Sequence, residues 1–217
     1  VLTVEGAISL DEISAPTATS NYGKLWTQTD NNMYFQDGAG TNTVLRKGGK
    51  HTIWVPAAAM YPETTNGCSP LTQVELSNGP ELKCLDFADG ADDHAQFTVA
   101  FPKSWNEGTI TFEPFWTVSG TNTGTVAWGL SGTCFANDAT INTAFSSPVV
   151  TVALAHSGTS NDLMKSAVSG NVTIQNAAAD TLCIFRIMRD ISADTQSGSA
   201  RLLGIKLYAC WAACIAF

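Results

Sequence analysis

The chain has 217 residues, of which 44% are hydrophobic and only 14% are charged, and its formal net charge at pH 7 is −8. This length allows one large all-β domain with a small additional part. An acidic chain with 11 scattered basic residues does not fit the phosphate backbone of nucleic acids, which needs clustered lysine and arginine. No apolar run reaches the length of a membrane span and no signal segment opens the chain, so we expect no membrane insertion.

Residues 1–20, VLTVEGAISLDEISAPTATS, predict an extended N-terminal arm. The Ala15–Pro16 step favours an extended or turn conformation. Apolar residues that could add a strand to a neighbouring sheet edge are Leu2, Val4, Ile8 and Leu10. We therefore expect the arm to be disordered in the free protein and ordered on a binding partner.

Residues 21–50 predict a small β-meander. The stretch GKLWTQTDNNMYFQDGAGTNTVL (23–45) contains three short apolar-faced strands, with turns at Thr29–Asn32 and Asp37–Gly40. The glycines of RKGGK (46–50) mark a hinge after it. Three strands this short cannot bury enough apolar surface to fold alone, so the meander needs a partner.

Residues 51–217 predict a jelly-roll-like antiparallel β-sandwich, because short strands and turn signals alternate regularly. In AQFTVAF, for example, Phe97, Val99 and Phe101 share one face. The predicted strands span 51–55, 72–76, 81–87, 95–101, 108–119, 124–134, 148–155, 171–175, 181–190 and 201–210. Asn/Asp capping signals predict two short helices, at 137–145 and 161–168.

The six cysteines lack the spacing of a zinc site. Cys134 and Cys183 lie in apolar runs, which is typical of buried free thiols. If the protein works in an oxidising compartment, Cys68 and Cys84 are the first candidates for a disulfide.

The loop LDFADGADDH (85–94) is the most distinct candidate for a ligand site. Its ionisable residues are Asp86, Asp89, Asp92, Asp93 and His94. Oxygen-rich loops bind calcium, but the spacing of a calcium loop is not met, which favours an acidic turn in solvent.

Glu113 is a candidate for one of the two carboxylates of glycoside hydrolysis, although the sequence places no second one. Because Glu113 precedes Pro114, a strand irregularity is the simpler interpretation. His156, Ser157 and Asp162 are adjacent in sequence, whereas catalytic triads join distant residues, so a loop is favoured.

Aromatic residues crowd one region of the chain, at Trp105, Phe112, Phe115, Trp116 and Trp128. Aromatic platforms bind sugars, but these residues alternate with apolar neighbours inside strands, which favours core packing. NVT (171–173) matches a glycosylation acceptor. The sequence thus assigns no catalytic, cofactor-binding or metal-ligating residue.

The stretch 23–45 resembles a short module of phage fibre and virion surface proteins, whose common form is YGKLY…DGKLYFKDDAGTE. HTIWVPAAAMYPETTNGC, AQFTVAFPKSWNEGTITFEPFW, TGTVAWGL and ARLLGIKLY are similar to the C-terminal domain of structural proteins of tailed phages. The resemblance covers residues 9–208. The apolar end ACWAACIAF departs from the family's pattern.

The resemblance implies a non-enzymatic virion protein on the head or tail surface, either a head fibre or a capsid decoration protein. It implies a homotrimer anchored by the arm to the major capsid protein or another virion protein, with the sandwich facing outward. The alternative is a tail-fibre protein that binds a host glycan.

Overall fold

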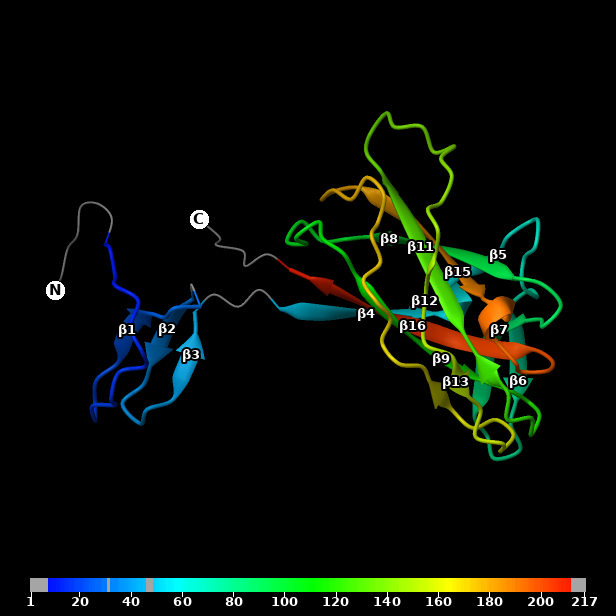
Figure 1. Cartoon of the computed structure of the whole chain (residues 1–217), viewed down its shortest axis with the longest axis horizontal. Coiled ribbons are helices and arrows are strands. Elements are labelled where there is room, and N and C mark those ends of the chain that lie inside the picture. Colours follow the sequence, from blue (N-terminus) through cyan, green and yellow to red (C-terminus); the bar gives the residue numbers. More distant parts are fainter. Residues whose placement is uncertain (1–7, 31, 46–48, 212–217) are drawn as a thin grey trace. The chain divides into compact units, whose positions relative to one another are not determined.

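The computed structural model describes residues 8–30, 32–45 and 49–211, and the chain divides into two compact units between Gly49 and Lys50 (Figure 1). Nearly all regular structure is β. Two short 3-10 helices, η1 (Ala57–Ala59) and η2 (Ile191–Ala193), connect strands of the second unit. No helix in the described part of the chain has the length and apolar character to cross a membrane.

The first unit is an antiparallel three-stranded meander, as predicted. It contains β1 (Lys24–Thr27), β2 (Met33–Gln36) and β3 (Asn42–Val44) in that order. The carboxylate of Asp37 accepts hydrogen bonds from the backbone N–H groups of Ala39 and Thr41, which fixes the turn between β2 and β3.

The two faces of the meander differ. Trp26 is buried on one face, where it stacks on Tyr34 with ring centroids 5.1 Å apart. The opposite face exposes Leu25, Met33 and Phe35, which are 59%, 40% and 38% accessible. Among the described residues of the first unit, none therefore covers this apolar face completely.

The described part of the N-terminal arm lies along the meander, which differs from the expectation that the free arm is disordered. The N–H of Ile13 donates to the carbonyl of Thr27, and the Thr27 hydroxyl donates to the backbone carbonyl of Asp11. The Gln36 amide donates to the carbonyl of Pro16. Because β1 has a free edge, the arm pairs with it. Leu2 and Val4 lie outside the described residues.

The second unit is an antiparallel β-sandwich, as predicted (Figure 1). One sheet has the order β12-β11-β15-β8-β5, with strands Val149–Val150, Trp128–Phe135, Leu182–Arg189, His94–Ala100 and Tyr61–Pro62. The other has the order β14-β9-β16-β7-β6, with strands Met164–Lys165, Thr111–Thr117, Ala200–Cys210, Glu81–Phe87 and Thr72–Glu75. The strand β4 (Lys50–Pro56) also pairs with β16, and β10 (Thr125–Val126) pairs with β13 (Leu154–Ala155).

Side chains from both sheets form one core. Phe87 of β7 and Trp128 of β11 meet edge to face, with ring centroids 5.1 Å apart. Phe97 of β8 stacks on Phe185 of β15 at 5.3 Å. The inward and outward alternation along β8 is the one that the sequence predicts.

The strand β16 organises the second sheet. It pairs with β9 along one edge, while β7 and then β4 pair with successive parts of its other edge. Outward-facing positions on these strands therefore lie in rows across the sheet, with Trp54, Lys206 and Glu113 in one row.

Both predicted helices are wrong. Residues 137–145 form turns and irregular backbone, and residues 161–168 contain the short strand β14. Asp138 and Asn161, which looked like capping residues, have φ of 62° and 63°. An N-cap needs extended backbone, so these residues make left-handed turns. The predicted strand at 171–175 contributes only isolated bridges, such as Ile110 to Val172.

The expected cysteine chemistry is also corrected. A disulfide joins Cys134 and Cys183, while Cys68 and Cys84 are free and buried. Cys134 lies directly opposite Cys183 in the register of β11 and β15. Strand pairing rather than closeness in sequence decides which thiols meet.

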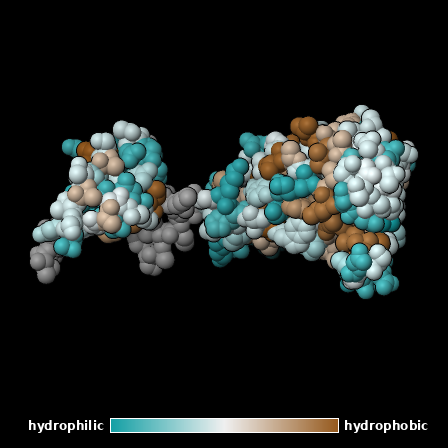
Figure 2. Space-filling view, turned by 90° about the horizontal axis from the view of Figure 1, so that it is seen from below, coloured by the Kyte–Doolittle hydropathy of each residue, from teal (hydrophilic) through white to brown (hydrophobic). Residues whose placement is uncertain are grey.

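Figure 2 shows brown apolar groups on the surface of the sandwich unit, separated by teal and white residues. The exposed large apolar side chains of this unit include Trp54 and Tyr61, at 47% and 49% accessibility. Exposed aromatic residues mark surfaces to be considered for ligand binding.

Candidate functional site

The carboxylates of the acidic loop 85–94 stabilise the fold through hydrogen bonds and an ion pair within the protein. Three of its carboxylates accept backbone N–H groups, in the pairs Asp89 with Gly198, Asp92 with Ile191, and Asp93 with Ala88. The hydrogen bond from Gly198 holds the pKa of Asp89 below its ordinary value. Asp86 pairs with Arg201, with Oδ1 and Nε 3.3 Å apart. The described residues contain no cluster of three His, Cys, Asp or Glu side chains able to hold a metal ion.

Arg189 anchors the neighbouring loop. Its side chain is fully buried, pairs with Asp194 through Nε and Nη2 at 2.7 and 2.9 Å, and also donates to backbone carbonyls. The carbonyls are those of Phe87, Gln196 and Gly198. The acidic loop and Arg189 therefore fasten strand connections at one end of the sandwich.

His156, Ser157 and Asp162 form a loop, as favoured from the sequence. Ser157 donates to Asp162 at 2.7 Å, whereas Nδ1 of His156 lies 3.0 Å from the carbonyl of Asn122. The His156 ring is buried near Trp116, with ring centroids 6.2 Å apart. The residue types of a triad are present, but these contacts make a folded turn.

Four of the five clustered aromatic residues are buried in the core, which confirms that interpretation for Trp105, Phe112, Trp116 and Trp128. Phe115 differs, because it lies at an outward position of β9 and is partly exposed. Its ring contacts residues that the sequence analysis did not connect to it.

Glu113, two positions before Phe115, is the centre of a polar cluster on the outer face of the six-stranded sheet. Tyr208 of β16 donates its hydroxyl to Oε2 at 2.7 Å. The Nζ atoms of Lys165 and Lys206 lie 3.4 Å from Oε1 and 3.9 Å from Oε2. The Glu113 side chain is only 7% exposed, so its partners enclose the carboxylate.

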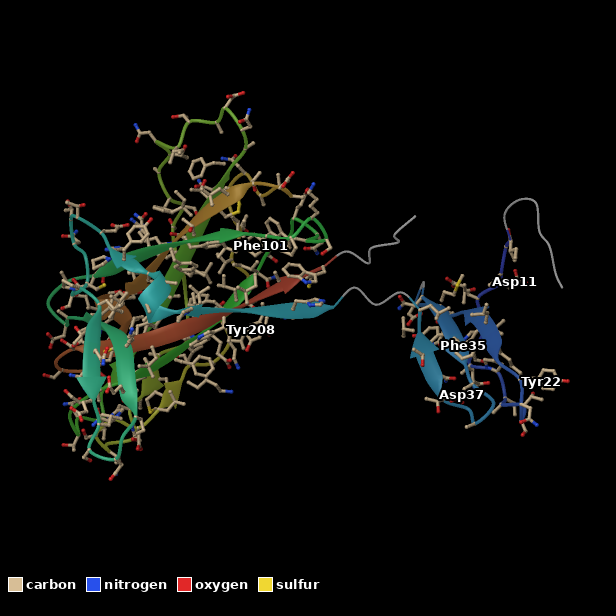
Figure 3. All side chains as sticks on the ribbon, turned by 180° about the vertical axis from the view of Figure 1, so that it is seen from behind. Asp11, Tyr22, Phe35, Asp37, Phe101 and Tyr208 are labelled. Atoms are coloured by element: carbon tan, nitrogen blue, oxygen red, sulfur yellow. A yellow bond between two sulfur atoms is a disulfide. The ribbon has the colours of Figure 1, made fainter. Side chains whose placement is uncertain are left out.

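Tyr208 lies on β16 beside β4 (Figure 3). Burial, followed by the hydrogen bond to Glu113, raises the pKa of its phenol to about 12. The hydroxyl therefore keeps its proton at neutral pH and donates a hydrogen bond to Glu113. This bond fixes the orientation of the Tyr208 ring.

Trp54 of β4 lies on the same outer face of the sheet as Glu113 and Tyr208. A Cβ atom at Gly204 would lie 2.6 Å from Cζ2 of Trp54, so the indole packs directly against the glycine backbone. The Trp54 and Phe115 rings are nearly perpendicular, with centroids 5.4 Å apart. Nearly half of the Trp54 side chain, 47%, remains exposed.

Lys206 connects the aromatic and polar parts of the face. It is the register partner of both Trp54 and Glu113, and its Nζ lies 4.8 Å from the centroid of Phe115. We refer to Trp54, Glu113, Phe115, Lys165, Gly204, Lys206 and Tyr208 as the aromatic–lysine face. It offers a flat apolar surface beside ammonium and phenol groups.

Sequence reasoning missed Trp54, Lys206 and Tyr208, although a signal was available. In HTIWV, Trp54 stands between the apolar Ile53 and Val55, and in GIKLY the residues Lys206 and Tyr208 alternate with Ile205 and Leu207. This alternation places all three outward. What the sequence does not provide is the pairing of β4 and β9 with the two edges of β16.

Two open depressions of the sandwich unit lie away from the aromatic–lysine face. One of about 400 Å³ is lined by residues 61–65 and Gln96, where the Gln96 amide donates to Glu63 at 2.7 Å. Another of about 300 Å³ is lined by Leu76, Ser77, Asn78, Pro80, Ser160 and Asn161. The aromatic–lysine face is an open sheet surface and suits a ligand that lies flat.

No family model and no curated protein matches the chain. Among solved structures, it is similar to CBM28, a carbohydrate-binding module specific for non-crystalline cellulose, with 14% identity and a TM-score of 0.39 over 72% of this chain and 89% of that one. It is also similar to Caldicellulosiruptor saccharolyticus CBM27-1 in complex with mannohexaose, with 7% identity and a TM-score of 0.39 over 72% and 96% of the two chains.

A third similar structure is described as the basis of promiscuous specificity in carbohydrate-binding modules of the β-sandwich superfamily. It has 11% identity and a TM-score of 0.29 over 84% of this chain and 71% of that one. These values establish neither a family nor a ligand for this chain.

Proposed function

We propose that the protein is a non-enzymatic surface protein of a tailed-phage particle, a trimeric head fibre or capsid decoration protein whose sandwich unit binds a host glycan. The virion part of the proposal is supported by the string of phage-like motifs between residues 9 and 208. The same surface would serve the alternative, a tail-fibre protein that binds its receptor.

The observation that carries the glycan part is the exposed indole of Trp54, which packs against Gly204 and lies nearly perpendicular to the Phe115 ring. A pyranose ring has an apolar C–H face that stacks on an aromatic ring, and its hydroxyl groups need polar partners at the rim. Lys206 and Tyr208 stand on the strand next to Trp54. Large flat aromatic side chains with adjacent polar groups suit a carbohydrate ligand.

The non-enzymatic part of the proposal is supported by the surroundings of Glu113. A general acid must reach the glycosidic oxygen of its substrate. Glu113 is enclosed by Lys165, Lys206 and Tyr208, and its side chain is 7% exposed. We assign it the role of holding these three side chains in place.

The assembly part of the proposal gives residues 1–20 the task of joining the particle and gives the meander the task of forming the trimer. The support is the exposed apolar face with Leu25 and Phe35, which association into trimers would cover. The partner on the particle would be the major capsid protein or another virion protein. The protein would then be located on the virion surface.

The glycan part is tested by screening the full chain on a glycan array and measuring the affinity of the best ligand by calorimetry. Trp54→Ala should weaken binding at least tenfold, because it removes the stacking surface. Tyr61→Ala is a matched control, since Tyr61 is equally exposed on the other sheet. Equal affinity of the wild type and Trp54→Ala would move the site away from this face.

The virion part is tested by reconstructing intact particles by electron cryomicroscopy and locating the two units in the map. Density for the sandwich unit on the head or tail surface would support the proposal. Absence of the chain from purified infectious particles, judged by mass spectrometry, would contradict it.

A further inference from the structure

The charges of the aromatic–lysine face narrow the class of saccharide. Outward positions on β4, β9, β14 and β16 carry four cations, at Lys50, Lys165, Arg201 and Lys206. The carboxylates among the described residues that balance them are Glu113, and Asp86 of β7. In a chain of net charge −8, this face has a local excess of positive charge.

Arg201 and Asp86 neutralise each other, because Nε and Oδ1 lie 3.3 Å apart and both side chains are about four-fifths buried. Glu113, by contrast, is shared by two lysines. A single carboxylate can balance only one ammonium group, so the cluster of Glu113, Lys165 and Lys206 keeps one uncompensated positive charge.

Lys206 is the group best placed to use that charge. Its Nζ lies 3.9 Å from Oε2 of Glu113, close to the longest distance at which an ion pair is counted. The Tyr208 hydroxyl donates a hydrogen bond to the same oxygen at 2.7 Å. The ammonium group has three N–H donors, and its side chain is 38% exposed. Lys206 therefore keeps donors for a ligand while the Phe115 ring holds its position.

The position of Lys206 relative to Trp54 connects this charge to the proposed stacking surface. The two residues are register partners on neighbouring strands, which lie about 4.8 Å apart in a β-sheet. A sugar ring stacked on Trp54 would bring its ring substituents beside Lys206. Lys165, 59% exposed, extends the positive region towards β14.

We infer that the ligand of the aromatic–lysine face is an acidic saccharide, whose ring stacks on Trp54 and whose carboxylate or phosphate group binds Lys206 and Lys165. The inference rests on the proposed glycan binding and specifies its chemical class. The shared chemistry is an anionic oxygen group on a sugar, held by ammonium donors in a charge-assisted hydrogen bond.

The test compares acidic polymers with their neutral forms, using the full chain and affinity electrophoresis. The carboxylate arm uses polygalacturonate, alginate and polysialic acid against methyl-esterified polygalacturonate. The phosphate arm uses dextran phosphate against unmodified dextran. We expect at least one acidic polymer to bind at least tenfold more tightly than its neutral form, and raising the salt concentration to reduce that preference.

Variants assign the preference to residues. Lys165→Gln with Lys206→Gln should reduce the ratio of acidic to neutral affinity at least tenfold. Lys103→Gln is the control, because Lys103 is exposed and pairs with Asp180 instead. Circular dichroism and the unfolding midpoint of each variant verify that the sandwich remains folded.

The possible results separate the two claims. Equal, salt-independent binding of acidic and neutral forms, abolished by Trp54→Ala, would overturn the acidic specificity and leave the glycan site in place. A preference unchanged in the double lysine variant would likewise overturn it. If no acidic or neutral saccharide bound at all, the proposed glycan binding would fail together with this inference.

Discussion

The sandwich and the meander are both antiparallel β-structures, but they differ in what holds them together. The sandwich buries a continuous core with Trp116, Trp128 and Phe185 fully enclosed. Among the described residues of the first unit, Trp26 is the one buried apolar side chain. Burying one large side chain yields about 3 kcal/mol, whereas fixing the backbone costs about 1–2 kcal/mol per residue.

The sandwich can therefore be stable by itself, whereas the meander needs additional contacts. The sandwich has the core of an independent domain, and its exposed aromatic residues are free to bind a ligand. The meander exposes Leu25, Met33 and Phe35 and gains part of its cover from the arm. Its stability should therefore depend on association with other molecules.

The largest expected effect is the loss of association when the exposed face of the meander is changed. We expect the full chain to be a homotrimer by light scattering at micromolar concentration, and Leu25→Ser with Phe35→Ser to make it a monomer. Leu71→Ser, on the sandwich, is a control with similar exposure. A monomeric wild type whose meander still resists protease would show that this unit needs no partner.

Breaking the buried ion pair should cause the largest loss of stability within the sandwich. Arg189→Met leaves Asp194, whose side chain is 3% exposed, without its partner. This should reduce the free energy of unfolding by about 3–5 kcal/mol in urea titrations. Lys103→Met breaks an exposed pair with Asp180 and should change little. Similar values for both variants would contradict the role given to Arg189.

Substitution of one buried and one exposed tryptophan of the sandwich distinguishes a role in the core from a role in ligand binding. Trp128→Ala should lower the free energy of unfolding by about 3–5 kcal/mol, because it leaves a cavity beside Phe87. Trp54→Ala should cost well under half of that while weakening glycan binding. If Trp128→Ala left thermal stability unchanged and removed binding, Trp128 would belong to the ligand site instead of the core.

The smallest expected effect is the alkaline loss of stability. Burial raises the pKa values of Tyr208 and Cys68 to about 12, and that of Cys84 to about 11. Their protonated forms are favoured in the folded state. Their contribution to stability should thus be constant below about pH 8, where the unfolded thiols begin to ionise, and be lost as the pH rises towards 12.

The alkaline prediction is measured by urea titrations at several pH values. Tyr208→Phe should flatten the part of the decline above about pH 10, where the unfolded phenol ionises. An equal alkaline slope with and without the Tyr208 hydroxyl would contradict its burial against Glu113.

Much of the fold could be predicted because strand signals are local. The strand 81–87 and the meander turns follow from alternation and turn residues. The failures came from information that is not local. Asp138 and Asn161 carry the residue types of helix caps, yet only the backbone conformation decides between a cap and a left-handed turn.

The candidate site could be predicted only in part. Glu113 was singled out for its carboxylate, but its neighbours come from β14 and β16, which no spacing rule connects to it. Trp54 and Phe115 meet because Gly204 leaves room between them. The same limit explains the disulfide, since Cys134 and Cys183 meet through the register of β11 and β15.

The central place of β16 has a consequence for how the protein is made. β16 is the last of the described strands to be synthesised. Its pairing partner β4 is synthesised about 150 residues earlier and cannot form this pairing until β16 has left the ribosome. Until then, β4, β7 and β9 have open edges that other nascent chains could pair with. Synthesis that stalls before residue 200 should therefore yield aggregates, and chaperones that shield strand edges should matter most late in translation.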